Sequence, residues 1–170
     1  NQEQTGVSQQ FIDEQKLIID SAQALASVFL SNGFRLASGG TDNHLMLVKR
    51  PNGLTGYAAQ EATEPIGITI NKNLGPDDDQ PAKIGSYVRI GTPANAGRGV
   101  TVEETKTIGN VLTELWNNTT ENNAHKPITP PEVISRLKPR IDEIVAAHPI
   151  YPDLLAMYQF IADDLGIPIN

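Results

Sequence analysis

The chain has 170 residues and a formal net charge of −7 at pH 7, and it contains no cysteine. This length favours a single globule with its own apolar core, and the lack of cysteine excludes disulfide scaffolds, cysteine-ligated metals and thiol nucleophiles. The net negative charge argues against a nucleic-acid partner, and without a membrane-spanning run or a secretory leader we expect a cytoplasmic protein with no membrane contact.

The first fifty residues predict one long helix followed by two strands. Apolar residues recur at helical spacing over residues 9–30, and the helix should end at Asn32-Gly33 because glycine can take the left-handed conformation that closes a helix. Short apolar runs at residues 34–37 and 45–48 predict a pair of strands. The small and polar residues 38–44 between them are typical of a turn.

The middle of the chain predicts a helix, two more strands and a surface loop. Thr55 can cap a short helix that extends to Ala62, and the alternation in Ile68-Thr69-Ile70 predicts a third strand. Residues 74–85 contain three consecutive aspartates and two prolines, so we expect a surface loop with a solvated acidic run. Residues 87–90 predict the last strand.

An open loop and then a helix follow this strand. The loop is expected over residues 94–99, which are mostly small. Thr101 and Glu104 form a capping box, in which each side chain satisfies a free backbone N–H at the start of the helix. Residues 117–126 after this helix are polar and lack periodicity, which indicates a linker or mobile loop.

The C-terminal part predicts two further helices. Thr129 and Glu132 repeat the capping-box pattern for a helix that Pro139 should kink or interrupt. A final helix is expected to begin near Leu154 and to end at Gly166. The whole order of elements describes an α+β fold, in which a small, mostly antiparallel sheet has helices packed on one face.

Arg89 is the one residue whose position indicates a binding role. It stands inside an otherwise apolar strand, between Val88 and Ile90. Its guanidinium offers two parallel N–H donors that match a carboxylate, so such an arginine indicates an anion site. The alternative is a strand arginine that points to solvent or pairs with an acidic neighbour, and spacing alone favours that alternative.

No other group of residues indicates a reaction. Residues 41–44 bring together an acid, an amide and an imidazole, but a metal centre would need further ligands at matched spacing, and His125 and His148 stand in unrelated contexts. We therefore interpret residues 41–44 as a turn and expect no metal site. The sequence contains no nucleophile elbow and no glycine-rich phosphate loop, so composition and spacing name no reaction.

Three segments of the chain resemble serine hydroxymethyltransferase, also called glycine hydroxymethyltransferase. They read SGGTDNHL at residues 38–45, GITINKN at residues 67–73 and RIGTPA at residues 89–94, the last followed by Arg98-Gly99. They occur in the family's order and at about its spacing. The resemblance extends from about Gln9 to Tyr151 and is confined to the smaller C-terminal domain of this family. It implies the fold that this domain has in fold-type-I pyridoxal phosphate enzymes.

The resemblance also implies roles for three residues. Arg89 matches the arginine that binds the carboxylate of the amino-acid substrate, which turns the balance toward the functional interpretation of this residue. Asn73 matches an asparagine close to the folate ring. Arg98 matches a second arginine near the active site, for which we expect only electrostatic support. His44 receives no catalytic role from the resemblance.

Several parts of the family's active site have no counterpart in this chain. The family's Schiff-base lysine, its ring-stacking histidine and the aspartate beneath the pyridine nitrogen belong to an upstream large domain, and His125-Lys126 lacks the threonine run that precedes that lysine. The resemblance implies that the missing large domain binds pyridoxal phosphate and that tetrahydrofolate is the co-substrate. The intact enzyme is expected to convert serine into glycine as a homo-oligomer, whereas this chain alone contains no catalytic residue and should be inactive.

We expect residues 1–152 to form the C-terminal domain and residues 153–170 a helical extension. The sequence opens at Asn1 rather than at a methionine, which favours a piece of a longer enzyme. Two alternatives stay open. One is a free-standing, non-catalytic module that binds an amino acid or a partner protein through the same strand. The other is a different fold-type-I enzyme, such as an aminotransferase, against which residues 39–44 argue.

Overall fold

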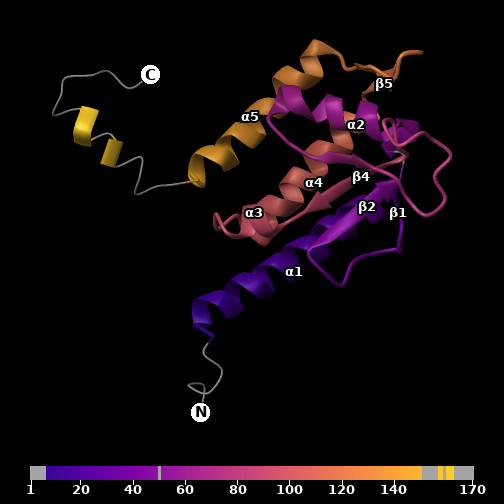
Figure 1. Ribbon diagram of the computed structural model, residues 1–170. Coiled ribbons are helices and arrows are strands. Elements are labelled where there is room, and N and C mark those ends of the chain that lie inside the picture. The colour runs from indigo at the N-terminus through magenta and orange to yellow at the C-terminus, as the bar shows by residue number, and fades with distance from the viewer. Residues whose placement is uncertain (1–6, 50, 151–156, 159, 163–170) are drawn as a thin grey trace.

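The structure, a computed structural model, describes residues 7–49, 51–150, 157–158 and 160–162. Its centre is a four-stranded antiparallel sheet in the order β1 (Arg35–Leu36), β2 (Leu45–Lys49), β4 (Tyr87–Gly91) and β3 (Asn71–Asn73), beside which the helices α1 (Gln9–Ser31) and α4 (Val102–Asn117) run (Figure 1). The apolar side chains of the sheet pack with those of the helices on one side of the sheet, and a second apolar cluster joins the helices over residues 56–63, 102–117 and 131–147. The predicted α+β fold, with helices packed on one face of a small antiparallel sheet, is therefore confirmed.

The elements are short apart from three long helices. In chain order they are α1 (Gln9–Ser31), β1 (Arg35–Leu36), β2 (Leu45–Lys49), η1 (Pro51–Gly53), α2 (Gly56–Thr63), η2 (Glu64–Ile66), β3 (Asn71–Asn73), β4 (Tyr87–Gly91), α3 (Pro93–Ala96), α4 (Val102–Asn117), β5 (Thr120–Glu121), β6 (Pro127–Ile128) and α5 (Pro131–Ala147). The strands β5 and β6 form a separate two-stranded hairpin.

The helix boundaries follow the predicted caps in the first two thirds of the chain. Gly33 takes a φ of 81° just after α1, as expected for the residue that closes a helix in the left-handed conformation. Thr55 caps α2 by accepting a hydrogen bond from the backbone N–H of Ala58. Thr101 and Glu104 form the complete capping box at the start of α4. Each of these caps is made by neighbouring residues, so the sequence alone was enough to predict it.

The predicted strand over residues 68–70 is wrong, because β3 begins only at Asn71, which pairs with Arg89 of β4. Ile70 is buried in the core and Ile68 packs against it, while Thr69 is exposed. The alternating pattern of residues 68–70 therefore reflects alternating burial of their side chains, although these residues do not pair with another strand. Residues 68–70 instead line one side of a cavity next to β4.

Two predicted loops contain regular structure. Residues 94–99 do not form an open loop throughout, since the short helix α3 covers their first part. Residues 117–126 are not a free linker, because β5 and β6 pair as a hairpin there. Glu121 of this hairpin accepts hydrogen bonds from the backbone N–H of Thr55, at 3.0 Å, and from its hydroxyl, at 2.8 Å. The hairpin is thus attached to the start of α2 through a contact that no local pattern predicts.

The start of α5 also differs from its prediction. Pro130 is the N-cap residue and no side chain caps the helix. The hydroxyl of Thr129 instead lies 2.8 Å from the hydroxyl of Thr119, so it is used in a contact with the end of α4. The helix continues through Pro139 without interruption.

The core is anchored by three aromatic rings. Phe29 and Trp116 have ring centroids 5.7 Å apart, and Phe34 lies 6.0 Å from Phe29 and 5.9 Å from Trp116. The indole N–H of Trp116 donates to the carbonyl of Ala59 at 3.1 Å, so the buried ring keeps its polar group satisfied. This cluster joins α1, α2 and α4 behind the sheet.

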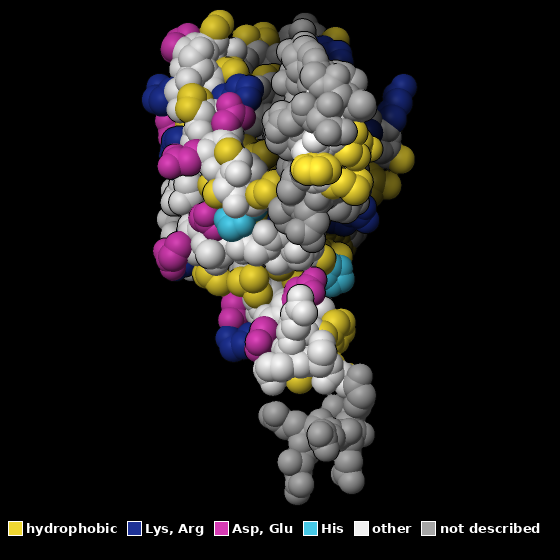
Figure 2. Space-filling view, turned by 90° about the vertical axis from the view of Figure 1, so that its left-hand side faces the viewer, with side chains coloured by type: hydrophobic (Ala, Val, Ile, Leu, Met, Phe, Trp, Pro, Cys, Tyr) yellow, Lys and Arg dark blue, Asp and Glu magenta, His cyan; other side chains and the backbone are white. Residues whose placement is uncertain are grey.

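The N-terminal end of the described chain is exposed, and most of the predicted C-terminal helix is not described. The first turns of α1 project beyond the body of the fold (Figure 2), where Phe11 is 51% and Ile12 46% exposed. The division into residues 1–152 and 153–170 stays a prediction, because the helix expected from Leu154 to Gly166 falls largely outside the described residues. Within the described part, no helix is both long and apolar enough to cross a bilayer.

The close packing of α1 on α4 depends on the absence of a side chain at Gly109. A Cβ placed there would lie 2.8 Å from Leu25 Cδ1 and 3.1 Å from Val28 Cγ1. We expect Gly109→Val to lower the free energy of unfolding by about 1–3 kcal/mol because the extra methyl groups overpack this contact. Urea unfolding followed by tryptophan fluorescence measures the change.

Asn110→Val is the matched control, since Asn110 is exposed on the same turn of α4. It should change the free energy of unfolding by less than about 0.5 kcal/mol. Equal changes in the free energy of unfolding for the two substitutions would show that the packing of α1 on α4 does not depend on the missing side chain at Gly109.

Candidate functional site

The strand β4 presents Arg89 on the face of the sheet that the helices leave open. Val88 and Ile90 are buried on the inner face, whereas Arg89 is exposed between them. Directly opposite Arg89 lie Leu47 of β2 and Asn71 of β3. Among the described residues, the side chain of Arg89 has no hydrogen-bond partner and no ion-pair partner. In this chain taken alone the guanidinium therefore faces solvent without an acidic partner, and its charge is available to an anion.

The register brings Asn73 to the same face as Arg89. Asn73 pairs with Tyr87, two residues before Arg89 on β4, so Asn73 and Arg89 are diagonal neighbours on adjacent strands. Asn73 is half-buried, and its amide donates to the carbonyl of Leu74 at 2.6 Å. Two of the three residues that the resemblance singled out thus lie next to each other.

A loop over residues 74–86 forms one boundary of this open face. Tyr87 points to the same face as Arg89 but is only 2% exposed, because the loop covers its ring. The carboxylate of Asp77 accepts hydrogen bonds from Lys49 and from the hydroxyl of Tyr87, and these two bonds lower the pKa of Asp77 to about 2. Gly75 is required for this contact, since a Cβ there would lie 1.9 Å from the Tyr87 ring.

Asp78 holds the same loop together from inside. Its carboxylate accepts from the backbone N–H groups of Gly75, Gln80 and Ser86 at 3.1, 2.9 and 2.9 Å. Burial raises the pKa of Asp78, but these hydrogen bonds outweigh burial, so the net shift of the pKa is downward. The interpretation of the three aspartates as a solvated run is therefore wrong for Asp78, whereas Asp77 stays exposed although it is hydrogen-bonded.

The turn over residues 38–44 bounds the open face at its other end. The hydroxyl of Thr41 donates to the carbonyl of Leu45 at 2.7 Å, and the side chain of Asn43 accepts from the backbone N–H of Leu45 at 2.9 Å. The interpretation of this segment as a turn is confirmed. His44 is exposed, and its carbonyl accepts from the backbone N–H of Thr92 at 3.0 Å.

Arg98 lies on the opposite side of β4 from Arg89. It is half-buried, and its Nε donates to the carbonyl of His148 at 2.8 Å at the end of α5. Its Nη2 also donates to the carbonyls of His148 and Val145. Because cations are stabilised by the free carbonyls of a helix C-terminus, Arg98 stabilises the end of α5. The structure therefore does not bring Arg98 together with Arg89 and Asn73.

His148 and Glu104 extend this contact to the start of α4. His148 Nδ1 lies 3.2 Å from the carbonyl of Arg98, and Nε2 lies 2.9 Å from a carboxylate oxygen of Glu104. The backbone N–H of Thr101, the His148 ring and the Thr101 hydroxyl lower the pKa of Glu104 to about 2. The capping-box pattern located Glu104, but no sequence signal pointed to His148 as its partner.

Two of the described lysines, Lys49 and Lys126, do not suit an imine with pyridoxal phosphate. An imine with the cofactor needs a lysine that can be an uncharged amine. Lys126 donates to the Tyr57 hydroxyl and, at 3.3 Å, to Glu61, and these bonds raise its pKa. Asp77 likewise raises the pKa of Lys49. Within the described part of the chain, no group of three His, Asp or Glu side chains is placed to hold a metal ion.

Comparison with known proteins identifies relatives of the chain. A sequence model of the family described as serine hydroxymethyltransferase matches residues 3–112. The serine hydroxymethyltransferase of Marinomonas sp. (strain MWYL1) is 38% identical over 143 residues, which cover 84% of this chain and 33% of that protein. The chain thus spans about a third of the length of this relative.

The ionised carboxylate of Glu104 should stabilise the fold only above acid pH. Its pKa of about 2 in the folded chain lies below the ordinary value of 4.5. Its contribution to folding is therefore fully present above about pH 4.5 and is lost as the pH falls through about 2. We expect Glu104→Gln to lower the free energy of unfolding by about 1 kcal/mol at pH 7 and to be indistinguishable from the unsubstituted chain near pH 2.

Denaturant unfolding across this pH range measures the difference. Glu103→Gln serves as the control, because Glu103 is exposed and pairs only with Lys106 on the helix surface. An effect of Glu104→Gln that stays constant from pH 7 to pH 2 would contradict the assignment.

Proposed function

The chain belongs to the serine hydroxymethyltransferase family, and from this membership we propose that it is the C-terminal domain of such an enzyme. The whole enzyme would convert serine and tetrahydrofolate into glycine and methylenetetrahydrofolate in the cytoplasm. Pyridoxal phosphate would act there as an electron sink. Its binding residues would lie outside this chain, which agrees with the share of the relative's length that the chain spans.

Arg89 carries the proposal. Its guanidinium is an exposed cation without a partner among the described residues, and it lies on the face that the helices do not cover. Gly91, the next residue on this face, has no side chain to compete for the guanidinium. Two parallel N–H groups of a guanidinium match the two oxygens of a carboxylate, which fixes the orientation of the bound amino acid as well as its position.

Asn73 would contact the folate from the same face. It is a diagonal neighbour of Arg89 in the register of β3 and β4, so both substrates would be bound within one small area. The loop of residues 74–86 forms the edge of this area and is held in place by Asp77 and Asp78. Arg98 would contact neither substrate, because it lies on the other side of the sheet, where it stabilises the end of α5.

The open face also carries apolar surface that a second domain would cover. Leu45 and Leu47 of β2 are half-buried there, next to Arg89. Covering them would bury apolar area and would remove water from around the guanidinium. An ion pair is stronger in such a partly dehydrated site than in bulk water, so the carboxylate should bind tightly only in the assembled enzyme.

We expect the 170-residue chain to be inactive on its own. Mixed with pyridoxal phosphate, it should give no imine absorbance band and should not cleave serine, because the lysine that forms the imine in this family would lie outside this chain. Absorbance spectra and glycine formation measure both properties. The intact enzyme, tested at the same concentration, is the positive control. An imine band together with serine cleavage by the chain alone would contradict the proposal.

In the intact enzyme, Arg89→Lys should weaken serine binding. Lysine keeps the charge but loses the two-pronged geometry. Loss of one hydrogen bond to a charged group, about 1.5–3 kcal/mol, corresponds to a rise of roughly 10–100-fold in the KM for serine. Steady-state kinetics at saturating tetrahydrofolate measure this rise.

Arg35→Lys provides the matched control, since Arg35 is an exposed arginine on β1, two strands away from Arg89. Its KM for serine should be unchanged. If Arg89→Lys also leaves the KM unchanged, Arg89 does not bind the substrate.

A further inference from the structure

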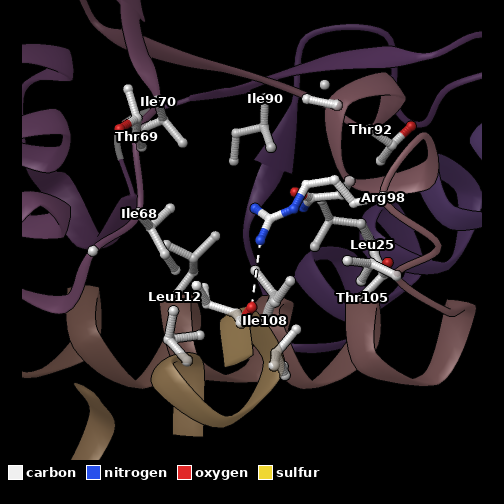
Figure 3. A pocket seen from close by; sticks show the side chains of 18 residues that line it. Leu25, Ile68, Thr69, Ile70, Ile90, Thr92, Arg98, Thr105, Ile108 and Leu112 are labelled. Carbon is white, nitrogen blue, oxygen red and sulfur yellow. Dashed lines mark hydrogen bonds between the residues drawn. The ribbon is translucent and has the colours of Figure 1, made fainter. Parts of the chain in front are cut away.

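A cavity of about 320 Å³ lies on the inner side of β4, behind the strand that carries Arg89 (Figure 3). The cavity lies between residues 68–70, which do not pair as a strand, and the place where α3, α4 and α5 approach the sheet. Its walls are mainly aliphatic and include Leu25, Ile68, Ile90, Ile108, Leu112 and Ile144. A volume near the lower end of the range for ligand sites suits a small, largely apolar molecule.

The side chain of Arg98 reaches into this cavity among the aliphatic groups (Figure 3). Its Nε and Nη2 donate to carbonyls at the end of α5. Its Nη1 donates no hydrogen bond to any described residue. The half-buried guanidinium therefore keeps two N–H donors for a further acceptor inside a mainly apolar space.

Arg98 also lacks a negatively charged partner within the described part of the chain. The carboxylate of Glu104, on the neighbouring helix, is bound by Thr101 and His148. The carbonyls at the end of α5 supply only the partial negative charge of a helix C-terminus. A half-buried guanidinium with free N–H donors favours a charged acceptor over a neutral one, so this cavity suits an anion.

We propose that the cavity binds an aliphatic carboxylate, whose carboxylate group pairs with Nη1 of Arg98 and whose hydrocarbon chain lies against Ile68, Ile90 and Ile108. The site is distinct from the proposed serine site, because the two lie on opposite faces of β4. Its existence does not depend on the proposed function. The apolar walls select the chain of the ligand and the guanidinium selects its charge.

Octanoate, titrated into the 170-residue chain with labelled isoleucine methyl groups, tests the proposal by NMR. Ile68, Ile90 and Ile108 should shift and saturate together. Ile12 and Ile128, which are 46% and 56% exposed and lie outside the cavity, should not move. Octanamide has the same chain without the charge and should bind about tenfold or more weakly. Equal binding of octanamide, or equal shifts at Ile12 and Ile128, would overturn the proposal.

Two variants test the residues. Arg98→Gln should weaken octanoate binding about tenfold or more, whereas Arg136→Gln should not, since Arg136 binds Glu114 on the helix surface. Ala94→Trp places a large side chain at an exposed position of the lining and should block octanoate without touching Arg98. Unchanged affinity in a folded Arg98→Gln or Ala94→Trp chain contradicts the site, and the comparison with octanamide holds even if Arg98→Gln does not fold.

Discussion

Five residue pairs hold β2 against β4, from Leu45 opposite Gly91 to Lys49 opposite Tyr87. This register sends four apolar side chains of the two strands toward the helices, where they are almost completely buried: Met46, Val48, Val88 and Ile90. It sends Arg89 the other way. Because side chains alternate along a strand, a slip by one residue would bury Arg89 and expose Val88. The register that closes the core is therefore also what presents the guanidinium to an anion.

The same strand separates two arginines with different surroundings. Arg89, on the outer face, is exposed beside Asn71, and its side chain makes no hydrogen bond or ion pair with any described residue. Arg98, behind the strand, lies among aliphatic side chains and is already half-satisfied by carbonyls of α5. An anion at Arg89 would bind between Leu47 and Asn71 on a face that is open to solvent. An anion at Arg98 would need a hydrocarbon part to replace water at the cavity wall.

Features carried by neighbouring residues could be predicted from the sequence, and features made by distant residues could not. The caps at Thr55 and Thr101 and the strand around Arg89 depend on local patterns, and they were predicted correctly. The attachment of the hairpin to α2 was missed because Glu121 binds Thr55, which is 66 residues away. The strand at residues 68–70 was predicted wrongly because alternating burial occurs there without a hydrogen-bonded partner strand. The joint position of Arg89 and Asn73 came from the resemblance and not from spacing.

The open face explains why a binding arginine can be exposed in this chain. An ion pair made by a solvated side chain contributes little, since water and salt screen it. The loop fixed by Asp77 and Asp78 and the turn at residues 38–44 supply two fixed edges around Arg89, but no described element lies over it. A wall above the sheet would exclude water and would strengthen the pairing without any change in Arg89 itself. The face is thus one half of a binding site, and its affinity should come from whatever closes over it.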